Sequence, residues 1–134
     1  MRLFALLLLF LQVPLVQSAT NPAVPSCKVI AKTPSSQSIQ CDLRAANPTT
    51  SFLLKVNFSG SHDDTRLSLE PLLNGKPLTC APGSLLSSEF EDGDISLVCK
   101  FSLPPGTDTA RLLRANFKWF HAQFVDYELA IDTK

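Results

Sequence analysis

Long parts of the chain alternate apolar and polar side chains with a period of two, which is the pattern of a strand that buries one face. The clearest runs are 38–45, 51–60 and 95–103. The apolar positions expected to share the buried side of these runs are Ile39, Cys41, Leu43, Leu54, Val56, Phe58, Ile95, Leu97, Cys99, Phe101 and Leu103. Turn-forming residues separate the runs, so the sequence predicts an all-β fold, an antiparallel β-sandwich.

Weaker signals predict two further strands. A short strand is expected at 27–33, joined as a hairpin to the run that follows it. Segment 66–80 alternates at its start, but Pro71 cannot donate a ladder hydrogen bond, which indicates an edge or interrupted strand. Within the same segment, Asn74-Gly75 predicts a tight turn.

The segment 109–131 fits a helix as well as a pair of strands. In a helix, its apolar residues recur at steps of three and four and line one stripe. The stripe consists of Leu113, Phe117, Phe120, Phe124, Tyr127 and Ile131. The cations of an adjacent arc are Arg111, Arg114, Lys118 and His121. This alternative gives an α+β fold with a C-terminal amphipathic helix at 109–131.

Read as strands, the segment alternates in two pieces. The apolar positions of the two pieces are Leu113, Ala115, Phe117 and Trp119, then Val125, Tyr127, Leu129 and Ile131. The phase slips between Phe120 and Phe124, which indicates a bulge or a tight bend near His121. The aromatic centre has low helix propensity and the rest of the chain is β-rich, so the strand interpretation is favoured.

The N-terminus has the composition of a secretory signal peptide. Arg2 is followed by an unbroken apolar run from Leu3 to Leu11, and small residues precede a cleavage point after Ser18 or Ala19. Nine apolar residues are too few to cross a hydrocarbon layer about 30 Å thick as a helix. We therefore expect a signal peptide rather than a membrane anchor.

These features predict the organisation of the whole chain. We expect a signal peptide at 1–18, a flexible leader at 19–26 and one sandwich-like domain at 27–134. No second long apolar run follows, so the sequence predicts a secreted, extracellular protein without a transmembrane segment. Without Arg2 the chain has eleven Lys and Arg against twelve Asp and Glu, a net charge of −1, which argues against general nucleic-acid binding.

All four cysteines lie in the predicted domain. An even number of cysteines in a small secreted domain predicts two disulfides, and the absence of a C-x-x-C spacing argues against a metal site. Local pairing, Cys27–Cys41 and Cys80–Cys99, is favoured because each pair brackets a predicted hairpin or loop. The alternative Cys41–Cys99 would suit a disulfide that links the two sheets, as in immunoglobulin domains. In those domains a Trp lies between the two cysteines, whereas Trp119 lies after both.

One glycosylation site is predicted. Asn57-Phe58-Ser59 fits the N-glycosylation sequon, and Asn57 falls on the polar side of the 51–60 run, where a glycan would sit in solvent.

Two clusters of residues could be given a chemical role, but a solvated loop or turn is the favoured interpretation of each. The run "SGSHDD" at 59–64 has the residue types of a triad, but neighbours in one turn cannot converge on a single substrate atom. The run "EFEDGD" offers Glu89, Glu91, Asp92 and Asp94 to calcium without the EF-hand spacing. His62 and His121 are the only histidines, too few for a His-based zinc centre. We therefore expect no catalytic residues, no metal and no cofactor.

The function that fits best is recognition by a non-enzymatic glycoprotein. The chain is expected to present loops or a sheet edge to an extracellular protein or glycan, with the acidic 87–94 loop and the edge near Pro71 as candidate contacts. The alternative is a lipid- or membrane-active protein that uses the basic-aromatic segment 109–127 as an amphipathic surface.

Overall fold

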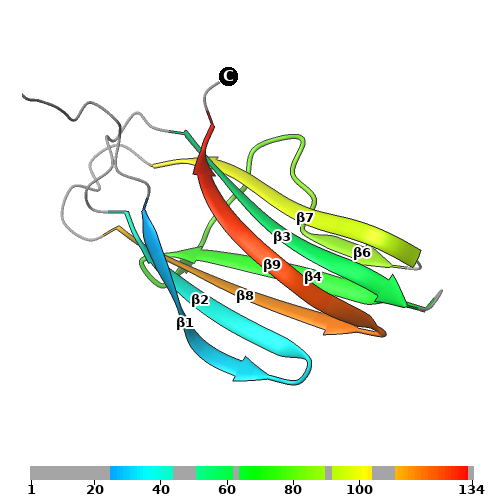
Figure 1. Cartoon of the computed structure of the whole chain (residues 1–134). Helices are drawn as coiled ribbons and strands as arrows, with labels where there is room; N and C mark the ends of the chain where they lie inside the picture. Colours follow the sequence, from blue (N-terminus) through cyan, green and yellow to red (C-terminus); the bar gives the residue numbers. More distant parts are fainter. Residues whose placement is uncertain (1–24, 44–50, 62–63, 90–91, 104–110, 133–134) are drawn as a thin grey trace, which may run out of the picture.

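The computed structural model describes residues 25–43, 51–61, 64–89, 92–103 and 111–132, and within them it confirms the all-β prediction. Two antiparallel sheets lie face to face (Figure 1). The strands are β1 (Ser26–Thr33), β2 (Ser36–Asp42), β3 (Ser51–Ser61), β4 (Arg66–Leu73), β5 (Lys76–Pro77), β6 (Ser87–Glu89), β7 (Asp92–Ser102), β8 (Leu112–Phe120) and β9 (Ala122–Ile131). The predicted signal peptide and most of the predicted leader lie outside the described residues.

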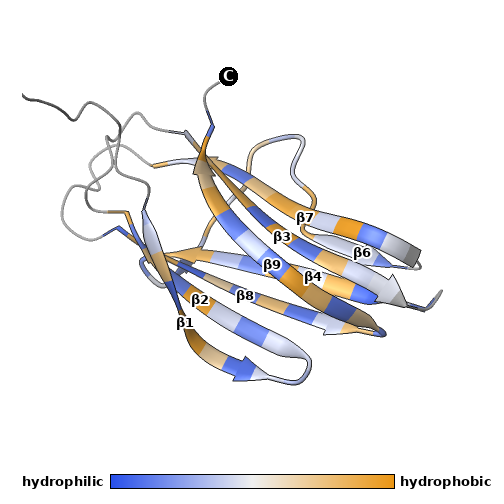
Figure 2. Cartoon of the chain, in the orientation of Figure 1, coloured by the Kyte–Doolittle hydropathy of each residue, from blue (hydrophilic) through white to orange (hydrophobic). Residues whose placement is uncertain are grey.

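The larger sheet has the order β1-β2-β8-β4-β5, and β6 also pairs with β4. The smaller sheet has the order β7-β3-β9. Hydropathy alternates along the strands of both sheets (Figure 2). None of the described residues forms a helix long and apolar enough to cross a membrane.

The core lies between the two sheets and uses the predicted inward positions. All eleven apolar residues assigned to the buried side of 38–45, 51–60 and 95–103 are buried. Phe117 has no exposed surface, and its ring centroid lies 5.3 Å from that of Phe124 and 6.4 Å from that of Phe58. Alternation alone therefore determines which face of each of these strands meets the opposite sheet.

The helix alternative for 109–131 is wrong within the described residues 111–131. Residues 112–120 form β8 in the larger sheet and residues 122–131 form β9 in the smaller sheet. The chain changes sheet at His121, whose φ is 54°. Because β8 and β9 do not form a hairpin, the junction needs no Asn-Gly or Gly turn.

This result removes the amphipathic surface on which the membrane hypothesis depended. Leu113 and Phe117 of the helical stripe are fully buried between the sheets. Arg111 of the basic arc is also buried, with 5% exposure. The remaining cations of the arc therefore do not border a continuous apolar stripe.

One inward assignment in β9 is wrong. Val125 was expected to face the core, but the pairing of β3 with β9 shifts between Asn57 and Phe58, so that Phe124 pairs with Phe58 and Asp126 with Asn57. The extra residue is Val125, which is 57% exposed. The bulge changes the phase of the strand, so Phe124 and Tyr127 pack against the core three positions apart.

The predicted hairpin and the predicted tight turn are both present. β1 pairs with β2, and Cys27 lies directly opposite Cys41 in the register and is bonded to it. β4 pairs with β5 through Asn74 and Gly75, whose φ values of 53° and 82° are those of a turn that favours Asn-Gly.

Pro71 does not interrupt β4 and is itself buried, contrary to the expectation of an exposed edge at this point. Its carbonyl accepts a hydrogen bond from the Leu78 N–H on the side away from β8. The N and C=O of one strand residue point to the same side, so the missing N–H of Pro71 costs no bond to β8.

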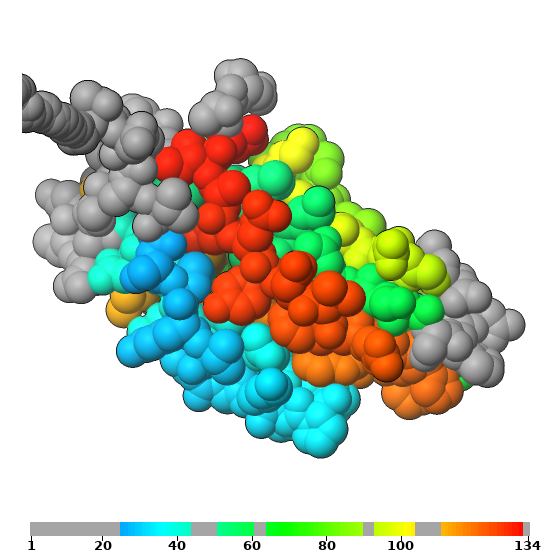
Figure 3. Space-filling view, in the orientation of Figure 1, coloured from blue at the N-terminus to red at the C-terminus, as the bar shows by residue number. Residues whose placement is uncertain are grey.

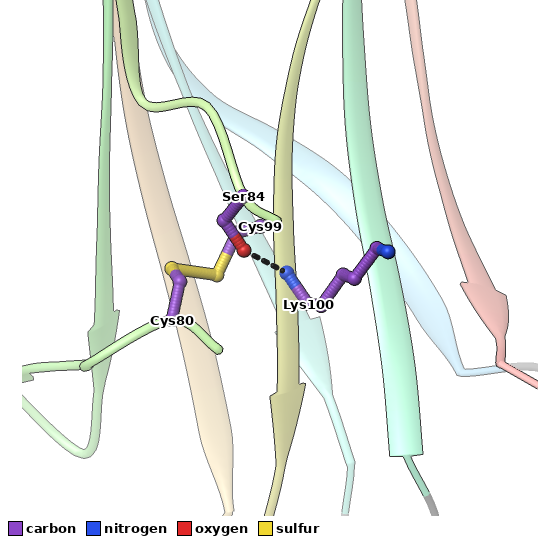
Figure 4. Close-up of a disulfide and its surroundings, with 4 residues drawn as sticks. All are labelled: Cys80, Ser84, Cys99 and Lys100. Atoms are coloured by element: carbon purple, nitrogen blue, oxygen red, sulfur yellow. Dashed lines mark hydrogen bonds between the residues drawn. A yellow bond between two sulfur atoms is a disulfide. The ribbon is translucent and has the colours of Figure 1, made fainter. Parts of the chain in front are cut away.

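The connection between β5 and β6 closes one side of the sandwich. Cys80 is bonded to Cys99 of β7, and Ser84 Oγ accepts a hydrogen bond from the Lys100 N–H at 2.9 Å (Figure 4). Leu85 then pairs with Val98 of β7, and the carbonyl of the next residue accepts from Leu69 N–H of β4. One segment is thus bonded to β7 of the smaller sheet and to β4 of the larger sheet. The alternative immunoglobulin-like disulfide, Cys41–Cys99, is not formed because both cysteines pair locally.

The opposite side of the sandwich carries the edge strands β1 and β9. Figure 3 shows this side, with β9 beside the β1–β2 hairpin. Both strands contain a register shift, at Ile30 and at Val125, and both carry charges that discourage edge-to-edge pairing.

A core substitution tests this packing. Phe117→Ala is expected to lower the free energy of unfolding by about 3–5 kcal/mol, because it leaves a cavity among four other aromatic rings. Val125→Ala should change it by less than about 0.5 kcal/mol, because the side chain is exposed. Denaturant unfolding of both variants measures the difference. If Phe117→Ala does not fold, Phe117→Leu should show a loss of about 1–2 kcal/mol. Equal effects at 117 and 125 would contradict the assigned core.

Candidate functional site

The outer face of the smaller sheet is polar and internally hydrogen-bonded. Asn57 of β3 lies between its neighbours on the two adjacent strands. Its Nδ2 donates to Asp126 Oδ1 at 2.6 Å, and its Oδ1 accepts from Ser96 Oγ at 2.6 Å. The side chain of the predicted sequon residue therefore points to the outer face, as expected from the alternation.

At the centre of the outer face of the larger sheet, polar side chains also form hydrogen bonds with one another. Ser38 Oγ donates to Asn116 Oδ1 at 2.6 Å, and Asn116 Nδ2 donates to Glu70 Oε1 at 3.3 Å. This row of three strands uses its polar groups internally. Cations on the same face are left without such partners: neither Arg114 nor Lys118 forms an ion pair with any residue that the structure describes.

A hollow of about 450 Å³ lies on this face, toward the end of β8 that leads into β9. Its outward-facing lining comes from two neighbouring rows of the sheet. The first row is Glu89, Arg66 and Phe120, and the second includes Ser87, Ser68 and Lys118. These residues lie on β6, β4 and β8, whose hydrogen bonds hold the rows in register.

Arg66 is oriented by an aromatic ring. Its Cζ lies 5.6 Å from the ring centroid of Phe120, its direct partner on β8. On β6 its direct partner is Glu89, with which it makes no ion pair in the described part of the chain. The cation–π contact holds the guanidinium beside the hollow without neutralising its charge.

Phe120 is held in turn by residues around His121, where the chain passes from β8 to β9. Its ring stacks on His121, with ring centroids 4.0 Å apart and planes inclined by 24°. His121 Nδ1 contacts Asp64 Oδ1, and Thr65 Oγ1 donates to the backbone carbonyl of His121 at 3.0 Å. A chain of contacts therefore runs from Asp64 through the two rings to Arg66.

The sequence-based chemical candidates are not assembled by the described residues. His62 and Asp63 lie outside them, and Asp64 contacts His121, at the junction of β8 and β9, instead. Glu89 and Asp94 of the acidic run lie in different sheets. Glu91 and the side chain of Asp92 lie outside the described residues, and no metal-binding cluster occurs within those residues.

The hollow itself was not predicted. Of its lining, Ser87 and Glu89 belong to the acidic 87–94 loop that was a candidate contact, and Glu89 is the only acidic residue of the two. A signal for the rest was present, because Arg114, Asn116 and Lys118 alternate on the outward side and Phe120 continues their phase. An aromatic residue at an outward position of a strand, after two cations, indicates an exposed ring beside basic side chains.

The comparisons with known proteins leave the function open. No protein-family model matches the chain, and no curated protein matches it. The enzymatically active domain of tailspike protein 4 from bacteriophage CBA120 has 13% identity and a TM-score of 0.43, over 84% of this chain and 18% of that chain. A structure of manganese lipoxygenase from Gaeumannomyces graminis with part of zonadhesin from Komagataella pastoris has 18% identity and a TM-score of 0.37, over 90% of this chain and 45% of that chain. The chain spans less than half the length of either, and neither likeness is close enough to support an argument.

The backbone conformation of His121, at the junction of β8 and β9, can be tested directly. His121 has a left-handed φ, which Asn tolerates and a β-branched residue does not. His121→Val is expected to lower the free energy of unfolding by about 1–2 kcal/mol more than His121→Asn. Both variants lose the imidazole, so the difference between their denaturant midpoints isolates the backbone effect. Equal midpoints would contradict the assigned conformation.

Proposed function

We propose that the chain is a secreted, non-enzymatic glycoprotein that recognises an extracellular protein or glycan partner through the outer face of its larger sheet. The observation that carries the proposal is the hollow beside Phe120. There, Arg66 and Lys118 stand on a rigid sheet face with no ion-pair partner among the described residues. Cations held in place but not neutralised are suited to bind an external anionic group.

Two further features support an extracellular role. Cys27–Cys41 and Cys80–Cys99 are both formed, and disulfides of this kind are typical of oxidising compartments. The N-terminal residues 1–18 have the composition of a signal peptide.

The non-enzymatic part of the proposal rests on the exposure of an Asp–His pair, the one pair among the described residues that resembles a catalytic unit. Asp64 and His121 have side chains that are 41% and 44% exposed. Catalytic acid–base pairs work in sheltered sites where water is excluded and donors converge on the substrate. We interpret this pair as a support for Phe120.

The proposal is tested by reversing charges on the larger sheet, first at the hollow and then, as a control, away from it. The double variant Arg66→Glu/Lys118→Glu is expected to weaken binding of the labelled mature protein to cell surfaces or extracellular matrix at least about tenfold, because two charge-assisted contacts are lost. The matched control Lys28→Glu/Lys76→Glu changes the net charge equally at exposed positions away from the hollow. Flow cytometry over a concentration series gives both affinities, and unfolding curves verify that the variants fold.

Binding that is unchanged in the hollow variant would place recognition elsewhere and contradict the proposal. An equal loss in both variants would show a response to net charge alone. Pretreatment of the target with protease or with glycosidases separates a protein partner from a glycan partner.

The predicted glycan gives a separate test. Asn57 is expected to carry an N-glycan in protein secreted from animal cells, so Asn57→Gln and Ser59→Ala should remove an endoglycosidase-sensitive mobility shift. Ser59→Thr keeps the sequon and should keep the shift. The hollow lies on the outer face of the other sheet, so binding should be the same with and without the glycan. A wild-type chain that endoglycosidase leaves unchanged would refute the glycosylation.

A further inference from the structure

We infer that the hollow beside Phe120 binds an acidic sugar residue of a glycan, one that carries a sulfate or a carboxylate together with free hydroxyl groups. This inference rests on the proposed function and specifies its ligand. It follows from the mixture of charges in the hollow, the backbone bonding around it, and its size.

The two cations are placed for one shared anionic group. Arg66 is paired with Phe120, and Lys118 with Ser68, so Arg66 and Lys118 are diagonal neighbours on one face. Diagonal neighbours lie about 7–8 Å apart at the backbone, within reach of long side chains that converge on one group. A sulfate or carboxylate between them would accept from the guanidinium fork and from the ammonium.

The other lining groups match hydroxyls. Ser68 and Ser87 are cross-strand partners beside Lys118 in the hollow, and each hydroxyl can donate or accept. Glu89, on the far side of Arg66, can only accept when ionised, so it favours a ligand that offers hydroxyl donors. A sugar with one acidic group presents both features within one ring.

The backbone around the hollow disfavours a peptide. Peptides commonly bind a sheet by adding a strand to a free edge. At the hollow, β4 is paired on one side with β8 and on the other side with β6, so it offers no free edge. A ligand above β4 and β8 contacts side chains alone. A peptide with several carboxylates would bring more negative charge close to Glu89 than a sugar with one acidic group does.

The size of the hollow fits a small part of a larger ligand. Its volume of about 450 Å³ lies within the range of small-molecule sites, about 300–1,000 Å³. The hollow lies on an open sheet face, so the remainder of a glycan chain can continue across the surface.

The experiment uses the mature protein and five immobilised probes: a sulfated glycan, its desulfated neutral counterpart, a uronic-acid glycan, its carboxyl-reduced neutral counterpart, and a poly-glutamate peptide. We expect at least one acidic glycan to bind about tenfold more tightly than its neutral counterpart and than poly-glutamate. Arg66→Lys should weaken that binding because it loses the planar fork that binds an anion through two hydrogen bonds, while it keeps the charge. Lys76→Glu, on β5, should not weaken it.

Glu89→Gln provides a readout of specificity. It removes the carboxylate that disfavours acidic peptides, so binding of poly-glutamate should rise relative to binding of the acidic glycan. A substitution that merely damaged the sheet would lower the binding of both probes.

Equal binding of acidic and neutral glycans, tighter binding of poly-glutamate than of either acidic glycan, or binding of none of the probes would each overturn the acidic-sugar inference. Different outcomes separate a failure of this inference from a failure of the proposed function. If Arg66→Glu/Lys118→Glu abolishes binding to a protease-sensitive cell-surface partner while no glycan binds, the recognition face stands and the ligand class is wrong. If the hollow variants bind every partner normally, both conclusions are wrong.

Discussion

The contact between the inward faces of the two sheets is the interaction on which the rest of this structure depends. It is centred on Phe117 and Phe58, which belong to opposite sheets and are almost completely buried. The connection from β5 to β6 adds backbone hydrogen bonds to a strand of each sheet on one side, and the Cys80–Cys99 disulfide attaches it to β7. With the inward faces fixed in this way, the polar side chains of both sheets are left on outer faces where their positions are set by the register.

The junction at His121 connects the core to the candidate site. A single residue with positive φ allows the chain to leave the larger sheet and enter the smaller one while aromatic side chains on both strands still reach the core. The same junction places Phe120 on the outer face, where its ring contacts both the His121 ring and the guanidinium of Arg66. The exposed ring is thus a consequence of how the two sheets are joined, and it orients a cation that no described carboxylate neutralises.

Sequence reasoning recovered the features that depend on local periodicity. The inward faces of the 38–45, 51–60 and 95–103 runs, the Asn-Gly turn and the local disulfides all follow from the alternation or from the pairing of neighbouring strands. It failed where the outcome depends on distant partners. The bulge at Val125 arises from the pairing of β9 with β3, and continuous pairing of β4 past Pro71 depends on which side of β4 the β8 strand occupies. The hollow combines three strands that are remote in sequence, so composition alone could not group its residues.

Solution NMR of the mature protein tests the central claim, that residues 112–131 form one strand in each sheet joined at His121. The account predicts cross-strand nuclear Overhauser effects from β8 to both β2 and β4, for example between Leu69 and Phe117, and from β9 to β3. It also predicts extended-chain patterns on both sides of residue 121. Consecutive amide-to-amide effects through 112–131 in place of these cross-strand effects, the pattern of a helix, would contradict it.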